Sequence, residues 1–137
     1  MLYDDQNIFA RIIRNELPAI KVYEDEQVLA FMDIMPQAEG HTLVIPKTPA
    51  VTLLDLPPDA AAYTIKIVQK VAQAMKVALD VQGIVLMQLS GASAGQTVPH
   101  VHFHLIPSSV HELGKHALHM GDQEKIKALA ERIKAEL

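Results

Sequence analysis

The sequence predicts an α+β protein with an antiparallel sheet, because its strand-like segments follow one another mainly as hairpins rather than in regular alternation with helices. Two further observations support this class. A long segment, residues 57–79, has the apolar spacing of an amphipathic helix, and histidine alternates strictly with apolar residues over 100–106. With 137 residues and no internal repeat, the chain is expected to form a single domain, residues 1–137.

The N-terminal elements are bounded by capping and turn residues. A short helix is expected over residues 7–15, with Asn7 as its N-cap, and Pro18 ends this segment. Three strands are then expected, each bounded by acidic, glycine or proline turn residues: 20–24, 27–33 and 41–45.

Two longer helices have regular apolar faces. In the first, over residues 57–79, apolar residues recur at three- and four-residue steps: Ile65, Val68, Ala72, Met75 and Leu79. The second runs from the N-cap Asp122 to the C-terminus, with one apolar face: Ile126, Leu129, Ile133 and Leu137. Between them we expect a strand, a loop and a second strand: residues 84–89, 90–98 and 100–106.

Composition excludes several classes of protein. The net charge is −4 with acids and bases interspersed, which argues against binding to a nucleic-acid backbone. The absence of cysteine excludes disulfides and thiolate metal sites. No apolar run approaches the ~20 residues of a membrane span. The acidic start also lacks the layout of a signal peptide. We therefore expect a cytoplasmic protein that binds neither nucleic acid nor membranes.

The histidines are concentrated in one part of the chain. Six of the seven fall between positions 100 and 119, and three of these form the run His100-Val101-His102-Phe103-His104. In a strand, this period of two places three imidazoles on one face and sends Val101, Phe103 and Leu105 into a core. Such histidines could share a zinc ion, or one could attack phosphorus as a neutral nucleophile. The spacing alone leaves both chemistries open.

The loop before the histidines allows two interpretations. Its glycines, Gly91 and Gly95, flank a serine in the pattern of a serine-hydrolase elbow. A strand rather than a helix follows, however, and no histidine comes after Asp122, so the sequence argues against that class. The second interpretation is a phosphate cradle, in which glycines allow close backbone approach. Its donors would be the backbone N–H groups near residues 95–98, the Gln96 amide and the Thr97 hydroxyl.

The histidine run and the segments before it resemble the histidine triad (HIT) family of nucleotide hydrolases and transferases. The matching blocks are Ile8-Phe9-Ala10-Arg11-Ile12-Ile13, Phe31-Met32-Asp33-Ile34-Met35-Pro36-Gln37, Gly40-His41-Thr42-Leu43-Val44-Ile45-Pro46-Lys47 and Gly95-Gln96-Thr97-Val98. The resemblance covers residues 7–107, leaves 108–137 as a C-terminal segment and helix, and is strongest to the Hint branch of nucleoside phosphoramidases. It implies a HIT-like fold: a five-stranded antiparallel sheet with two principal helices. It also implies a homodimer with a ten-stranded sheet.

The resemblance also implies roles for the histidines. His102 would attack the α-phosphorus and form a nucleotidyl-histidine intermediate, which water then hydrolyses. His104 would contact the phosphate and help to protonate the leaving group. His100 and His41 would belong to the supporting hydrogen-bond network that orients His102.

A nucleotide pocket follows from the same resemblance. Asp33 would bind the ribose hydroxyls. The base would lie between largely apolar walls, which favour stacking on a purine: Ile8, Phe9, Ile12, Phe31, Met32 and Ile34. The remaining substrate contacts would come from the loop: Ser90, Gly95, Gln96, Thr97 and Val98. Ser90 stands where close relatives usually have asparagine, which puts that contact and the turnover rate in question.

The resemblance implies a metal-independent hydrolase of purine nucleoside phosphoramidates or related esters, without a cofactor. Asn7 and Ala10 stand where zinc-carrying relatives have cysteines, and Pro49 where they often have histidine, so no structural zinc is expected. Alternatives within the family are a dinucleotide hydrolase and a nucleotidyl transferase. A zinc-dependent hydrolase and a nucleotide-binding regulator with weak catalysis also remain open. Three histidines outside the motif receive no role: His111, His116 and His119.

Overall fold

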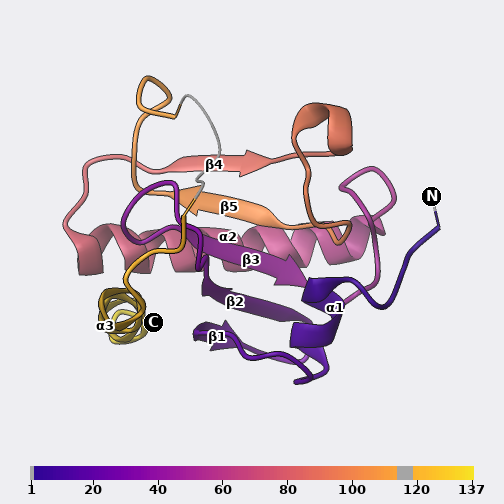
Figure 1. The fold of residues 1–137 in the computed structure, drawn as a ribbon, viewed down its shortest axis with the longest axis horizontal. Coiled ribbons are helices and arrows are strands. Elements are labelled where there is room, and N and C mark those ends of the chain that lie inside the picture. The colour runs from indigo at the N-terminus through magenta and orange to yellow at the C-terminus, as the bar shows by residue number, and fades with distance from the viewer. Residues whose placement is uncertain (1, 114–118) are drawn as a thin grey trace.

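The strands form one antiparallel sheet. The computed structural model describes residues 2–113 and 119–137. In these residues the strand order is β1-β2-β3-β5-β4, and every neighbouring pair is antiparallel (Figure 1). The strands are β1 Lys21–Glu24, β2 Val28–Met32, β3 Thr42–Pro46, β4 Val85–Gln88 and β5 Phe103–Ile106. The predicted α+β class with a five-stranded antiparallel sheet is confirmed.

Capping residues position the helices as expected. The helices are α1 Ile8–Ile13, α2 Pro58–Leu79 and α3 Gln123–Lys134, together with a short 3₁₀ turn at Ala92–Ala94. The Asn7 side chain accepts a hydrogen bond from the Ala10 N–H at 2.9 Å, which satisfies a free donor of the first turn of α1. Asp122 does the same for α3, through the N–H groups of Glu124 and Lys125. None of the described helices has the length and apolar character needed to cross a membrane.

The two faces of the sheet are covered differently. Alternate residues of β2 point to opposite faces, as the strand period requires. Val28, Ala30 and Met32 belong to the larger core, which α2 and α3 cover. Leu29 and Phe31 belong to a smaller core under α1. All five are buried, so β2 is a central strand that separates the two layers.

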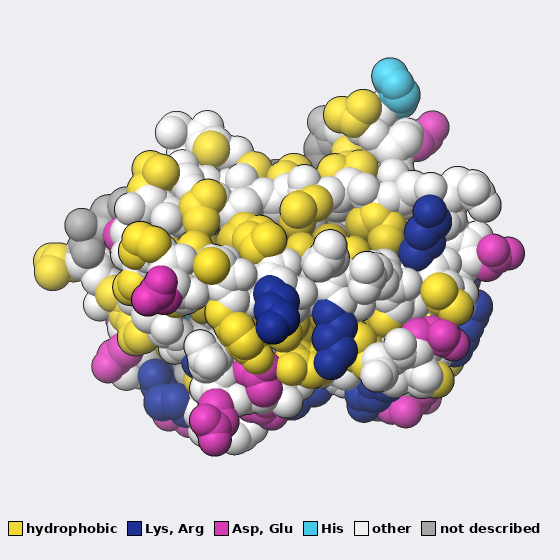
Figure 2. All heavy atoms as spheres, turned by 180° about the vertical axis from the view of Figure 1, so that it is seen from behind, with side chains coloured by type: hydrophobic (Ala, Val, Ile, Leu, Met, Phe, Trp, Pro, Cys, Tyr) yellow, Lys and Arg dark blue, Asp and Glu magenta, His cyan; other side chains and the backbone are white. Residues whose placement is uncertain are grey.

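The residues that α2 buries differ in part from the predicted ones. Val68 and Met75 are buried as predicted, but Ile65 is 44% exposed and Ala72 is only partly buried. The residues that face the core are Thr64, Ile67, Val68, Val71, Ala74, Met75 and Ala78. Because α2 carries apolar residues on more than one side, its periodicity did not identify the inner side. Ile65 and Val77 of α2 remain exposed. Figure 2, which views the molecule from behind, shows apolar side chains among the charged ones on that face.

The expected strand over residues 100–106 is only half formed. Val101, Phe103 and Leu105 are buried as predicted, but strand pairing begins at Phe103. The N–H of Val101 donates to the carbonyl of Ala50, in a loop, instead of to a strand. His100 and His102 therefore lie in the irregular segment that enters β5, and of the three only His104 lies in the sheet. The prediction of three imidazoles in one row along a strand was wrong, and His100 has different surroundings from the other two.

Candidate nucleotide site

A cavity of about 430 Å³ opens on the α1 side of the sheet. It brings together most of the residues predicted for the site: Ile8, Phe9, Ile12, Phe31, Met32, Asp33, Ile34, His41, Gly95, Thr97, Val98, His102 and His104. Its lining also includes residues that the prediction missed: Pro18, Ala19, Met35, Gln37 and Leu43. Three predicted residues do not line it: Ser90, Gln96 and His100.

One end of the cavity is apolar. Phe9 and Phe31 meet edge-on with ring centroids 5.4 Å apart, and both are almost fully buried. Ile8 and Ile34 are 54% and 44% exposed at the lining of the same cavity. Exposed isoleucines beside buried aromatic rings form a surface that a flat apolar group can cover. This end is suited to an aromatic base.

The hydrogen bonds of His102 determine which of its nitrogens is free to react. Its Nδ1 lies 2.7 Å from the backbone carbonyl oxygen of His100, which can only accept, so Nδ1 carries the proton. In the neutral ring, Nε2 then has a lone pair. The ring is held from the side by Phe9, whose centroid is 4.9 Å away at an interplanar angle of 90°. Nε2 is therefore the ring nitrogen of His102 that is available for chemistry.

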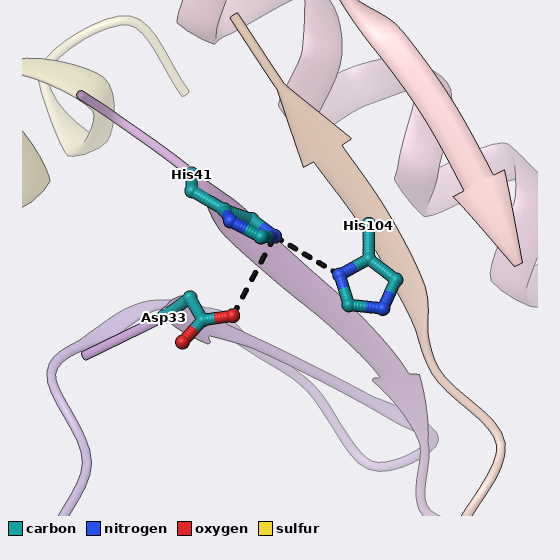
Figure 3. Close-up of side chains that lie close together, drawn as sticks. All are labelled: Asp33, His41 and His104. Atoms are coloured by element: carbon teal, nitrogen blue, oxygen red, sulfur yellow. Dashed lines mark hydrogen bonds and ion pairs between the residues drawn. The ribbon is translucent and has the colours of Figure 1, made fainter. Parts of the chain in front are cut away.

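A second hydrogen-bond chain orients His104. The backbone N–H of Gln37 donates to His41 Nδ1 at 3.0 Å, so neutral His41 carries its proton on Nε2. That nitrogen lies 2.9 Å from His104 Nδ1 and donates to it (Figure 3). The proton of neutral His104 is consequently on Nε2. His104 thus lines the cavity as an N–H donor, with its ring centroid 4.9 Å from that of His102.

Burial keeps the imidazoles neutral. Desolvation lowers the pKa of His102, and the bond to the His100 carbonyl opposes this only in part. Desolvation also lowers the pKa of His41 and of His100 to about 4 each. At pH 7 all three rings are then uncharged, as the lone pair on His102 requires.

Asp33 lies at the polar end of the cavity. Burial raises the pKa of this carboxyl to about 6, and the Met35 backbone N–H, which donates to Oδ1 at 2.8 Å, opposes the rise. The other oxygen, Oδ2, lies 3.5 Å from His41 Nε2 (Figure 3). Asp33 is mostly ionised at pH 7 and can accept hydrogen bonds from two adjacent hydroxyls.

The loop before the histidines is shaped by glycine. Gly91 and Gly95 have φ angles of 102° and 107°, in the region that favours glycine. The N–H groups of Gly95 and Gln96 donate within the loop, to the carbonyls of Ala92 and Gly91. Among the described residues, no hydrogen-bond acceptor pairs with the N–H groups of Thr97 and Val98, and both residues line the cavity. The phosphate donors that the geometry offers are therefore these two amides.

The Gln96 side chain ties the loop together instead of facing the cavity. Its Nε2 donates to the carbonyls of Val51 and Val98, at 2.7 and 3.0 Å, and its Oε1 accepts from the Gly91 N–H at 2.8 Å. Both amide hydrogens are thus in use, so a direct contact of this side chain with substrate remains only a prediction. Ser90 does not line the cavity either, and its hydroxyl donates to Gln88 Oε1 at 2.8 Å.

Among residues 2–113 and 119–137, the groups that could hold a metal ion are those that Figure 3 draws. Asp33, His41 and His104 bring one ligand atom each within 4.8 Å of one another. A ligating imidazole nitrogen must be unprotonated, and the other nitrogen then carries the proton. For His41 this proton would collide with the Gln37 N–H, which already points at Nδ1. The donor set suits a proton-bearing hydrogen-bond chain better than a metal.

Two of the histidines outside the motif do not belong to the cavity. His111 and His119 are exposed, and neither residue lines the cavity. His116 lies outside the described residues.

Comparison with known proteins places these features in context. The HIT domain family matches residues 14–111. The chain is 47% identical over 100 residues to an uncharacterized HIT-like protein of Methanocaldococcus jannaschii, covering 73% of this chain and 77% of that protein. It is 36% identical over 136 residues to the adenosine 5'-monophosphoramidase of Schizosaccharomyces pombe, covering 95% and 97%. A solved HIT-like protein from Bartonella henselae superposes with a TM-score of 0.92, at 47% identity and full coverage of both chains.

Proposed function

Because this chain belongs to the HIT family, in its Hint-like branch, we propose that it is a nucleotide hydrolase that cleaves purine nucleoside 5'-phosphoramidates or related conjugates. The observation that carries this proposal is the orientation of His102. Its Nδ1 proton is engaged by the His100 carbonyl, which leaves Nε2 as the nucleophile in a cavity of nucleotide size.

The reaction proceeds in two displacements at the α-phosphorus. His102 Nε2 forms a bond to phosphorus and the bond to the leaving nitrogen breaks. That nitrogen keeps the electron pair and takes a proton from solvent, helped by a hydrogen bond from His104 Nε2–H. Water then attacks the nucleotidyl-histidine, the bond from Nε2 to phosphorus breaks with its electron pair returning to His102, and the proton that water loses goes to solvent. The products are the amine and the nucleoside monophosphate, with both histidines restored.

The rest of the cavity binds the nucleotide. The edge-on pair Phe9 and Phe31, with the exposed Ile8 and Ile34, takes the purine. Asp33 accepts from the ribose hydroxyls. The N–H groups of Thr97 and Val98 face the phosphate oxygens, where each free amide contributes one donor.

The active form in this proposal is a homodimer joined along β4 into a ten-stranded sheet. Two features of the chain support the pairing. β4 is at one end of the strand order, so one side of its backbone has no neighbour within the described chain. Leu86 on this strand is 51% exposed. An open edge strand with an exposed apolar side chain favours pairing with another strand.

Release of AMP from adenosine 5'-phosphoramidate by the purified protein in EDTA tests the proposed activity. Turnover is expected at the same rate with and without EDTA, because the nucleophile is an imidazole that needs no metal. Activity that disappears in EDTA and returns with zinc would contradict the metal-free mechanism. Absence of AMP release under both conditions would contradict the hydrolase itself.

The pH dependence of this reaction is expected to separate binding from chemistry. As pH falls through about 6, Asp33 is protonated and loses acceptor capacity toward the ribose, so KM rises. His102, whose pKa is lowered by burial, keeps its lone pair to a pH below the ordinary imidazole value of ~6.5. Steady-state kinetics between pH 5 and 8 should therefore show KM rising as pH falls through about 6, and kcat falling with a midpoint below 6.5. A fall in kcat centred at or above pH 6.5 would contradict this assignment.

A further inference from the structure

A tyrosine from the N-terminal segment contacts the histidine behind the nucleophile. The Tyr3 hydroxyl lies 2.6 Å from His100 Nδ1, although the two residues are 97 positions apart in the chain. Their rings also meet edge-on, with centroids 5.6 Å apart and an interplanar angle of 69°. Tyr3 precedes residues 14–111, the range that the HIT domain family matches, so membership of the family assigns it no role.

The other partner of His100 determines the direction of this hydrogen bond. His100 Nε2 lies 2.8 Å from the carbonyl oxygen of Pro46, which can only accept, so Nε2 carries the ring proton. In the neutral ring Nδ1 is then an acceptor, and the Tyr3 hydroxyl donates to it. Because the His100 side chain is fully buried, Tyr3 supplies a partner that water cannot readily replace.

Residue 100 connects this contact to the reacting atom. Its side chain is held by Tyr3 and Pro46, and its carbonyl accepts the Nδ1 proton of His102 at 2.7 Å. Loss of the phenol hydroxyl would leave a buried acceptor unpaired, a cost that favours a shift of residue 100. Such a shift moves the carbonyl that orients His102.

We infer that Tyr3 is a positioning residue: its phenol anchors residue 100, so that the carbonyl of this residue holds His102 with Nε2 toward the substrate phosphorus. The N-terminal segment is thus part of the machinery that orients the nucleophile. The kinetic consequence rests on the proposed function, but the effect on His102 itself does not.

The inference is tested with Tyr3→Phe, which removes the hydroxyl and keeps the ring. In this variant kcat for AMP release is expected to fall roughly tenfold while KM stays within about twofold, because orientation is lost and the pocket is not. In ¹⁵N-edited NMR spectra of the free protein, the His102 Nδ1 proton should exchange with water faster than in the wild type. Tyr3→Leu, which also removes the ring, should show a larger change in both measurements.

Tyr23→Phe is the matched control. The Tyr23 hydroxyl also makes a part-buried hydrogen bond, to Asp25 at 2.7 Å, but Tyr23 does not line the cavity. Neither kcat nor the His102 exchange rate should change in this variant. An unchanged exchange rate in Tyr3→Phe would overturn the inference whatever the kinetics, and so would an equal loss of kcat in Tyr23→Phe. If the wild type releases no AMP, the proposed function fails and the exchange measurement alone decides the role of Tyr3.

Discussion

Replacement of His102 by asparagine is expected to reduce the release of AMP by at least about a thousandfold, the scale of loss when a covalent nucleophile is removed. The asparagine side-chain N–H can still donate to the His100 carbonyl, as Nδ1 does at 2.7 Å in the wild type. It has no lone pair on nitrogen that can attack phosphorus. The variant should therefore still bind the nucleotide but no longer cleave the substrate.

Two measurements separate these effects. Calorimetric titration with AMP should give a Kd within about threefold of the wild type, because the base and ribose contacts do not involve His102. His111→Asn is the matched control, since it makes the same substitution at an exposed position outside the cavity, and its turnover should be unchanged. Turnover by His102→Asn at the wild-type rate would remove His102 as the nucleophile.

Replacement of Asp33 by alanine is expected to raise KM by at least about tenfold, because even one hydrogen bond to a charged partner contributes about 1.5–3 kcal/mol. The value of kcat should change much less, since the ribose contact is made in the ground state as well as in the transition state. Although Oδ2 of Asp33 lies 3.5 Å from His41 Nε2, that nitrogen already donates to His104 at 2.9 Å. The chain that orients His104 should therefore persist.

A substrate that lacks the ribose hydroxyls can be combined with Asp33→Ala in a double-mutant cycle. With the wild type, 2',3'-dideoxyadenosine 5'-phosphoramidate should show nearly the same increase in KM as Asp33→Ala shows with the normal substrate. In the variant, removal of the hydroxyls should add little, because the two changes delete one interaction. Additive effects on KM would show that Asp33 does not bind the ribose.

Local sequence patterns predicted the elements of the fold well. Asn7 and Asp122 cap their helices as expected, because a side-chain acceptor beside a free N–H is a local feature. Ile126, Leu129 and Ile133 of the face predicted for α3 are buried, because they recur on one side of an otherwise polar helix. The helix ends at Lys134 rather than at the C-terminus, so Leu137 lies beyond it and is only partly buried. For α2 the same reasoning predicted the helix but not which of its sides is buried, because apolar residues lie on several sides.

The candidate site was less predictable from local pattern. Alternation over residues 100–106 gave the correct buried residues, yet it placed His100 beside His102 on a strand. Pairing fails there because the Val101 N–H bonds to Ala50, a contact that no local pattern encodes. The contact between Tyr3 and His100 is not encoded by a local pattern either, since it joins residues 97 positions apart. Resemblance to a family supplied most of the cavity residues, and the hydrogen-bond directions required coordinates.

Identification of the covalent intermediate tests the central claim most directly. The protein would be mixed briefly with adenosine 5'-phosphoramidate labelled with ³²P at phosphorus, quenched in alkali, in which phosphorus–histidine bonds persist, and mapped by peptide mass spectrometry. Label is expected on His102 in the wild type and absent from His102→Asn. Label on another residue, or rapid turnover without a labelled protein at any time, would contradict nucleophilic catalysis by His102.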